Sequence, residues 1–189
     1  MSQVHCSLLF AALSAVFLSL HLWPVAAEAD LIAKTCQNTK FPNLCVSSLN
    51  SDPTSPNADT KGLAVIMVEI GVANATATSS YLSSQLQFLY NKTVSSKNML
   101  MMKKVIKECA DKYLYASNAL KASLEDLTEE NYDYAFMHIS AAVDYPNACH
   151  NGFKRNKGLV YPSELAHREN GLKHICDVIS GIVDFLVGE

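Results

Sequence analysis

The chain has 189 residues, of which 49% are hydrophobic, and a formal net charge of −3 at pH 7. This hydrophobic fraction excludes an intrinsically disordered chain. The weak negative charge, without a basic stretch rich in aromatic residues, argues against nucleic-acid binding. At this length we expect one domain with a buried core.

The N-terminal segment is typical of a signal peptide. Residues 7–25 are apolar apart from serines and His21, and small residues follow at Val25, Ala27 and Ala29. We therefore predict a cleaved leader over residues 1–29 and a mature chain of about 160 residues that enters the oxidising secretory pathway. A retained membrane anchor is the alternative for this segment. No later segment is expected to span a bilayer.

Residues 30–58 are predicted to form a helical hairpin followed by a linker. Two short helical segments are interrupted at residues 40–42, with Cys36 before the break and Cys45 after it. Because so short a hairpin buries too little apolar surface to be stable alone, we expect a Cys36–Cys45 disulfide. Residues 51–59, rich in proline and serine, then separate this hairpin from the rest of the chain.

A first long helix is predicted from Asp59 or Thr60 to about Leu89. The apolar residues that recur along it at steps of three and four are Leu63, Ile66, Met67, Ile70, Ala73, Ala77, Tyr81 and Leu82. Sequons at Asn74 and Asn91 predict N-glycosylation. We expect Asn74 on the helix face that points away from the apolar residues, and Asn91 in the joint that follows the helix.

Two antiparallel helices are predicted over residues 99–153. Their apolar stripes are Met102, Ile106, Cys109, Tyr113, Ala116, Leu120 and Leu124 on the first helix, and Tyr132, Ala135, Ile139, Ala142 and Cys149 on the second. A polar joint at residues 126–131 connects them, and Thr128 is expected to cap the second helix. Because Cys109 and Cys149 lie at similar distances from this joint, the hairpin brings them level and predicts a Cys109–Cys149 disulfide.

The last helix is predicted after a linker at residues 156–162. Its apolar residues are Leu165, Leu172, Ile175, Ile179, Ile182 and Leu186. Cys176 lies on the buried flank of this helix and is left over from the two pairs, so we expect a free core thiol rather than a nucleophile. Four helices with short joints over residues 59–189 predict an all-α, up-down-up-down four-helix bundle.

The sequence offers no group of residues with catalytic spacing. His138 and Ser140 lie on different faces of one helix. His167 and His174 share a face, but Glu164 alone could join them, which is too few ligands for a zinc site. We therefore predict that the protein is not an enzyme and that it holds no metal and no cofactor.

Several segments together resemble the plant invertase and pectin methylesterase inhibitor family. They are residues 35–45, 51–53, 58–64, 132–135, 144–149 and 161–162. The resemblance covers essentially the whole mature chain, and within the family the sequence is similar to the cell-wall or vacuolar inhibitors of beta-fructosidase. It implies a four-helix bundle behind a helical hairpin, with the two disulfides expected above. It also implies secretion to the apoplast and cell wall, or delivery to the vacuole.

Invertase inhibitors of this family often carry a Pro-Lys-Phe motif before the third bundle helix, and this motif enters the substrate cleft of the enzyme. The matching positions here are Tyr132, Asp133 and Tyr134. The carboxylates of a glycosidase would repel Asp133 unless one of them is protonated. Three interpretations stay open: the tyrosines anchor the interface with Asp133 at its rim or paired with a basic group, the tip stays outside the cleft, or the tyrosines only close the bundle end.

The resemblance implies an inhibitor that binds an acid invertase and blocks its sucrose cleft, with pectin methylesterase as the alternative target. An enzyme or a lipid carrier is a third possibility, against which the tight helical periodicity argues, because it leaves no spacious interior. Without Glu28 the net charge is −2, and protonation of the four mature histidines would bring it to about +2. If histidines lie in the interface, binding to an acidic partner is expected to strengthen as the pH falls.

Overall fold

The computed structural model describes residues 31–92 and 96–188, and in these ranges every regular element is a helix. Residues 31–37 are helical and precede α3 (Pro42–Asn50) and the short 3-10 helix η1 (Ser55–Asn57). Four long helices follow: α4 (Thr60–Tyr90), α5 (Lys97–Thr128), α6 (Tyr132–Arg155) and α7 (Ser163–Gly188). The predicted all-α fold is confirmed. The predicted signal peptide lies outside the described residues.

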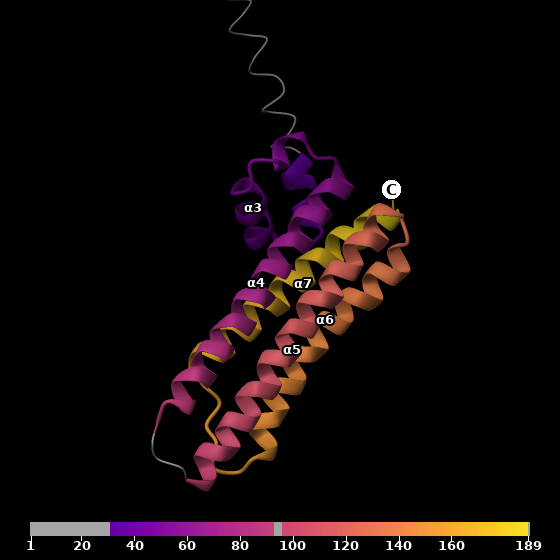
Figure 1. The fold of residues 1–189 in the computed structure, drawn as a ribbon. Coiled ribbons are helices and arrows are strands. Elements are labelled where there is room, and N and C mark those ends of the chain that lie inside the picture. Colours follow the sequence, from indigo (N-terminus) through magenta and orange to yellow (C-terminus); the bar gives the residue numbers. More distant parts are fainter. Residues whose placement is uncertain (1–30, 93–95, 189) are drawn as a thin grey trace, which may run out of the picture.

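The four long helices pack side by side, and successive helices run in opposite directions (Figure 1). α4 packs against α5 and α7, and α6 packs against the same two helices, with α6 and α7 touching least. α3 contacts α4 and α7 and lies at one end of the bundle (Figure 1). The apolar stripes of the helices meet in one core.

Two buried disulfides join elements of this fold. Cys36 and Cys45 lie with their Cα atoms 5.5 Å apart, and Cys109 and Cys149 with theirs 4.8 Å apart across the α5–α6 hairpin. Both predicted pairs are confirmed. Cys176 is buried and unpaired, and burial raises the pKa of its thiol to about 12. Such a thiol is almost entirely protonated at neutral pH and makes a poor nucleophile.

The second half of α4 buries a different stripe from the one predicted. Gly71, Ala75 and Thr78 are buried, whereas Ala73 and Ala77 are exposed. This face of α4 carries small residues because the neighbouring helices come close to it. A Cβ on Gly71 would lie only 3.0 Å from Leu120 Cδ1 of α5. Small and polar residues fill this contact, so a search for apolar periodicity misplaces it.

Because α4 buries a different face from the one predicted, the expectation for Asn74 also changes. Its Oδ1 is buried without a hydrogen-bond partner, and its Nδ2 lies 3.8 Å from the place a Cβ on Gly171 of α7 would take. The carboxamide thus faces α7 instead of pointing away from the bundle, and a glycan there would require the side chain to leave its position. Asn91, at the C-terminus of α4, is exposed.

α4 also departs from the expectation that no later segment could cross a membrane. By length and composition it is a candidate span, and within the described residues it is the only such helix. Nearly half of its most apolar stretch, 44%, is buried inside the bundle. A long buried helix of a bundle core has this same composition.

The joint between α5 and α6 is shorter than predicted. Thr128 belongs to α5 and its hydroxyl donates to the carbonyl of Leu124, 2.8 Å away, so it does not cap α6. Asn131 occupies the cap position without a side-chain cap bond. The chain reverses at Glu130, which has a φ of 60°, and the Asn131 N–H then donates to the Asp126 carbonyl at 2.8 Å. This closing bond is the one usually made after a left-handed glycine.

The N-terminal hairpin packs closely on α7 at Gly181. A Cβ there would lie 2.9 Å from the Cα of Thr39, which is backbone that cannot rotate away. We expect Gly181→Ala to lower the free energy of unfolding by about 1–3 kcal/mol relative to Gly171→Ala, where the same Cβ meets only ordinary contacts. Urea denaturation of both variants measures the difference. Equal stabilities would show that the hairpin does not dock on α7 in this way.

Candidate protein-binding surface

The α5–α6 joint forms an exposed tip at one end of the bundle. Tyr132 is half-buried and packs against the core, whereas Asp133 and Tyr134 are exposed. Tyr134 exposes 59% of its surface and Met137, one turn further along α6, exposes 62%. We call Asp133, Tyr134 and Met137 the tip surface. Exposed aromatic and methionine side chains of this kind are enriched in protein interfaces.

One ion pair lies next to the tip surface. Lys61, in the first turn of α4, lies with its Nζ 2.9 Å from Oε1 of Glu130. The hydrogen bond and the charge of Glu130 raise the pKa of Lys61. These two residues and Tyr132 line a shallow groove that also reaches Leu186 of α7. The ion pair therefore joins the start of α4 to the α5–α6 joint, and the end of α7 lies beside them.

A second polar contact joins α5 to α6 just behind the tip. His138 Nδ1 lies 2.6 Å from Oδ2 of Asp126. The two residues are twelve apart in sequence, so no helical spacing predicts the contact. Because His138 is one turn beyond Tyr134 on α6, this pair fixes the orientation of the helix that presents the tip surface.

Aromatic residues continue along the outer face of α5 and α6. The rings of Tyr115 and Tyr145 have centroids 5.6 Å apart. Lys112 Nζ lies over both rings, at 5.6 and 5.8 Å from the two centroids. The face therefore offers aromatic and cationic contacts beyond the tip, and the sequence reasoning missed the Tyr115–Lys112 part of it.

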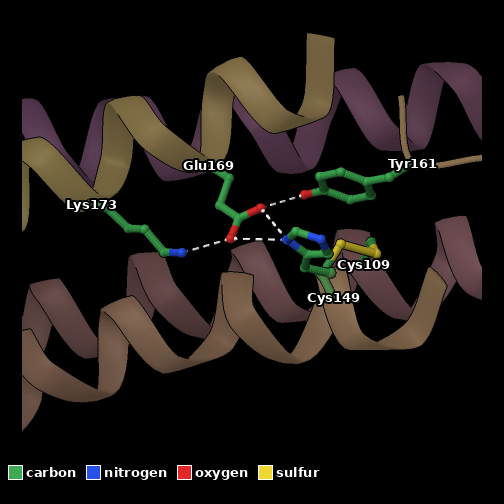
Figure 2. A network of polar contacts seen from close by, with 6 residues as sticks. Cys109, Cys149, Tyr161, Glu169 and Lys173 are labelled. Carbon is green, nitrogen blue, oxygen red and sulfur yellow. Dashed lines mark hydrogen bonds and ion pairs between the residues drawn. A yellow bond between two sulfur atoms is a disulfide. The ribbon is translucent and has the colours of Figure 1, made fainter. Parts of the chain in front are cut away.

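A buried carboxylate ties α7 to α6 behind this surface. Glu169 of α7 is only 3% exposed. Its Oε2 accepts a hydrogen bond from the Tyr161 hydroxyl at 2.8 Å, and its Oε1 accepts one from Lys173 Nζ at 2.7 Å. His150 of α6 completes the set, with Nδ1 3.1 Å from Oε2. Figure 2 shows this network beside the Cys109–Cys149 disulfide.

The charge of Glu169 is stabilised within this network. Burial raises the pKa of Glu169, but the hydrogen bonds from Lys173 and Tyr161 outweigh burial, and the pKa lies below its ordinary value. Burial and the bond to Glu169 raise the pKa of Tyr161. His150 stacks on the Tyr161 ring, with centroids 4.3 Å apart. Each polar group of this network therefore has a hydrogen-bond or ion-pair partner, so the role of the network is to join α7 to α6.

The residues considered for catalysis are not brought together. Ser140 is exposed, and His138 contacts Asp126 instead. Glu164 pairs with Arg168 at 2.7 Å, and His174 packs against Phe41 with ring centroids 4.1 Å apart and ring planes tilted by 32°. Over residues 31–92 and 96–188, no three His, Cys, Asp or Glu side chains converge in a way that could hold a metal ion.

Comparison with known proteins gives consistent matches. The family described as plant invertase/pectin methylesterase inhibitor matches residues 30–182. The "Cell wall / vacuolar inhibitor of fructosidase 2" of Arabidopsis thaliana is 49% identical over 157 residues, which cover 83% of this chain and 83% of that one. "Pectinesterase inhibitor 28" of Oryza sativa subsp. japonica is 34% identical over 164 residues, covering 86% of this chain and 72% of that one.

A solved structure matches the fold. It is the crystal structure of mutant form A of a pectin methylesterase inhibitor from Arabidopsis, with a TM-score of 0.61 and 25% sequence identity. The match covers 79% of this chain and 92% of that chain.

Proposed function

The chain belongs to the plant invertase/pectin methylesterase inhibitor family, and on that premise we propose that it is a non-catalytic protein inhibitor of plant acid invertase. The observation that carries this proposal is the 49% identity with a fructosidase inhibitor across most of both chains. The family and these relatives are inhibitors, not enzymes. Inhibition would come from a complex that blocks the sucrose cleft, and no step of it needs a cofactor.

The exposure of the tip residues separates their roles in the proposal. Tyr134 and Met137 are free to pack on a partner, whereas Tyr132 is held against the core and closes the bundle end. Asp133 is exposed beside them and would face a basic group of the enzyme or its rim, because the catalytic carboxylates repel it. We propose that Tyr134 and Met137 anchor the complex.

Pectin methylesterase is the second candidate target. The 34% identity with a pectinesterase inhibitor and the fold match favour it. The test is to titrate the purified protein against an acid invertase and a pectin methylesterase in parallel. We expect loss of invertase activity at about one inhibitor per enzyme. Inhibition of the esterase alone would overturn the proposal.

Substitution of the tip tests how the inhibitor binds. Replacing Tyr132 and Tyr134 together with alanine is expected to weaken inhibition at least tenfold, about 1.4 kcal/mol, and Tyr134→Ala alone should give most of the loss because its ring is exposed. The matched control is Tyr90→Ala at the opposite end of the bundle, where 60% of the residue is exposed. Inhibition constants and circular dichroism are measured for each variant. Equal inhibition by folded Tyr134→Ala and Tyr90→Ala would move the interface to the helix faces.

We further propose that residues 1–29 are removed as a leader and that residues 30–189 act in the cell wall or the vacuole. Among the four mature histidines, His138 lies beside the tip surface, paired with Asp126. If a histidine takes part in the interface, we propose that it is His138, because of this position beside the tip surface. Asn91, which is exposed, is the better of the two proposed glycan sites.

A further inference from the structure

The two ends of the bundle carry opposite charge. The acidic residues near the α5–α6 joint are Glu125, Asp126, Glu129, Glu130 and Asp133. The basic residues at the other end, where α4 and α6 finish and α5 begins, are Lys92, Lys97, Lys103, Lys104, Lys107, Lys154, Arg155 and Lys157. The proposed inhibitory tip lies at the acidic end. The proposed contact with invertase involves no residue of this basic end.

A cleft opens in this basic end between the first turns of α5 and the end of α6. Its volume is about 350 Å³, and its lining residues are Lys97, Asn98, Met101, Arg155, Asn156, Lys157 and Leu159. We call it the basic cleft. Three of its side chains are cations and none is a carboxylate. Among the described residues, no ion pair engages any of the three cations.

The wall of the cleft formed by the α6–α7 linker is held in place by hydrogen bonds. Asn156 Nδ2 donates to the Gly152 carbonyl at 2.7 Å. The Leu159 N–H donates to the Asn156 carbonyl at 3.1 Å, and Gly158 takes a φ of +99° in this turn. The linker therefore holds Lys157 against the end of α6 without using the cationic side chains.

Helix electrostatics explain only part of this charge. Arg155 ends α6, where a cation complements the negative end of the helix dipole. Lys97 is the first residue of α5, whose first turn has no acidic residue. A cation there meets the positive end of the helix, which is unfavourable. A bound anion would relieve this repulsion and the mutual repulsion of the three cations.

We propose that the basic cleft binds a carboxylate-bearing polysaccharide, and that it retains the inhibitor on an acidic wall matrix while the opposite end of the bundle engages the enzyme. The cleft is larger than one small inorganic anion requires and falls in the size range of small-molecule sites. Met101 and Leu159 provide apolar surface for the C–H face of a sugar. Further exposed lysines at positions 107 and 154 continue beyond the cleft, which suits a ligand whose charge repeats along a chain.

The experiment measures retention of the full mature protein on immobilised polygalacturonate at low salt. The test variant combines Lys97→Ala, Arg155→Ala and Lys157→Ala. The matched control combines Lys34→Ala, Lys40→Ala and Lys121→Ala, three exposed lysines outside the basic end, and removes the same charge. We expect the test variant to bind at least tenfold more weakly, the control to bind like the native chain, and retention to fall with added salt.

Three outcomes would overturn this proposal. They are equal loss in the control variant, equal binding to fully methyl-esterified polygalacturonate, and complete displacement from polygalacturonate by inorganic phosphate at an ionic strength at which sodium chloride leaves the protein bound, which would indicate a small-anion site. Invertase inhibition by the test variant is assayed separately and is expected to be unchanged. Because polysaccharide binding is measured without enzyme, failure of this inference is distinguishable from failure of the proposed function, on whose secreted location it rests.

Discussion

Replacing both Cys109 and Cys149 with alanine is expected to lower the free energy of unfolding by about 4 kcal/mol. The disulfide spans 40 residues of sequence, and opening so long a loop restores much conformational freedom to the unfolded chain. It also joins α5 to α6 beside the Glu169 network, so its loss frees the α5–α6 hairpin from the centre of the bundle. Chemical denaturation of the native protein and the double variant measures the difference.

The second disulfide supplies the comparison. Cys36 and Cys45 are nine residues apart, so Cys36→Ala with Cys45→Ala should lower the free energy of unfolding by about 2.7 kcal/mol. Cys176→Ala, which removes a buried thiol but no cross-link, controls for the loss of sulfur atoms. A larger loss from the Cys36–Cys45 pair than from Cys109–Cys149 would contradict the loop-length argument.

Glu169→Ala is expected to lower the free energy of unfolding by about 3 kcal/mol at neutral pH, because it leaves a lysine, a tyrosine and a histidine without their shared acceptor. Lys173 and His150 are about one-third exposed, and their partial hydration keeps the loss at the lower end of the range for broken buried pairs. Thermal and urea unfolding of the variant give the value. Glu164→Ala, which breaks only the exposed pair with Arg168, should change the stability by less than about 1 kcal/mol.

The effect of Glu169→Ala should depend on pH in a defined direction. The pKa of Glu169 is lowered from its ordinary 4.5 in the folded protein. Its carboxylate therefore stabilises the native state fully above about pH 4.5, and this contribution disappears as the pH falls through the lower folded-state pKa. The stability gap between native protein and variant should therefore narrow as the pH falls below about 4.5. A gap that widens below about pH 4.5 would contradict the lowered pKa of Glu169.

The sequence predicts the helices and both disulfides because these depend on local periodicity. Apolar residues recur clearly at steps of three and four in α5, α6 and α7, and the cysteines on α5 and α6 lie at similar distances from one joint. The prediction of the buried face fails at Gly71, Ala75 and Thr78, because close helix packing requires small side chains and a search for apolar residues does not detect them. The prediction that Thr128 caps α6 is also wrong, because its hydroxyl donates to a carbonyl within α5.

The candidate site is only partly visible in the sequence. The residues Tyr132, Asp133 and Tyr134 can be placed at the α5–α6 joint, and the apolar stripe that includes Tyr132 but not Tyr134 agrees with the half-buried Tyr132 and the exposed Tyr134. Glu169 occupies a core position between Leu165 and Leu172, so in the sequence it appears only as a charged residue that interrupts the apolar stripe of α7. Its partners Tyr161 and His150 come from the linker and another helix, and no local spacing relates them.

The Cys109–Cys149 bridge has a consequence for resistance to proteases. The tip lies inside the covalent loop that this bridge closes, so a protease that cuts the backbone at the exposed joint produces two pieces that stay bonded to each other. The nicked molecule keeps its mass until a reductant is added, and its two halves stay packed in one bundle. At this exposed segment, therefore, a single cleavage does not release a fragment.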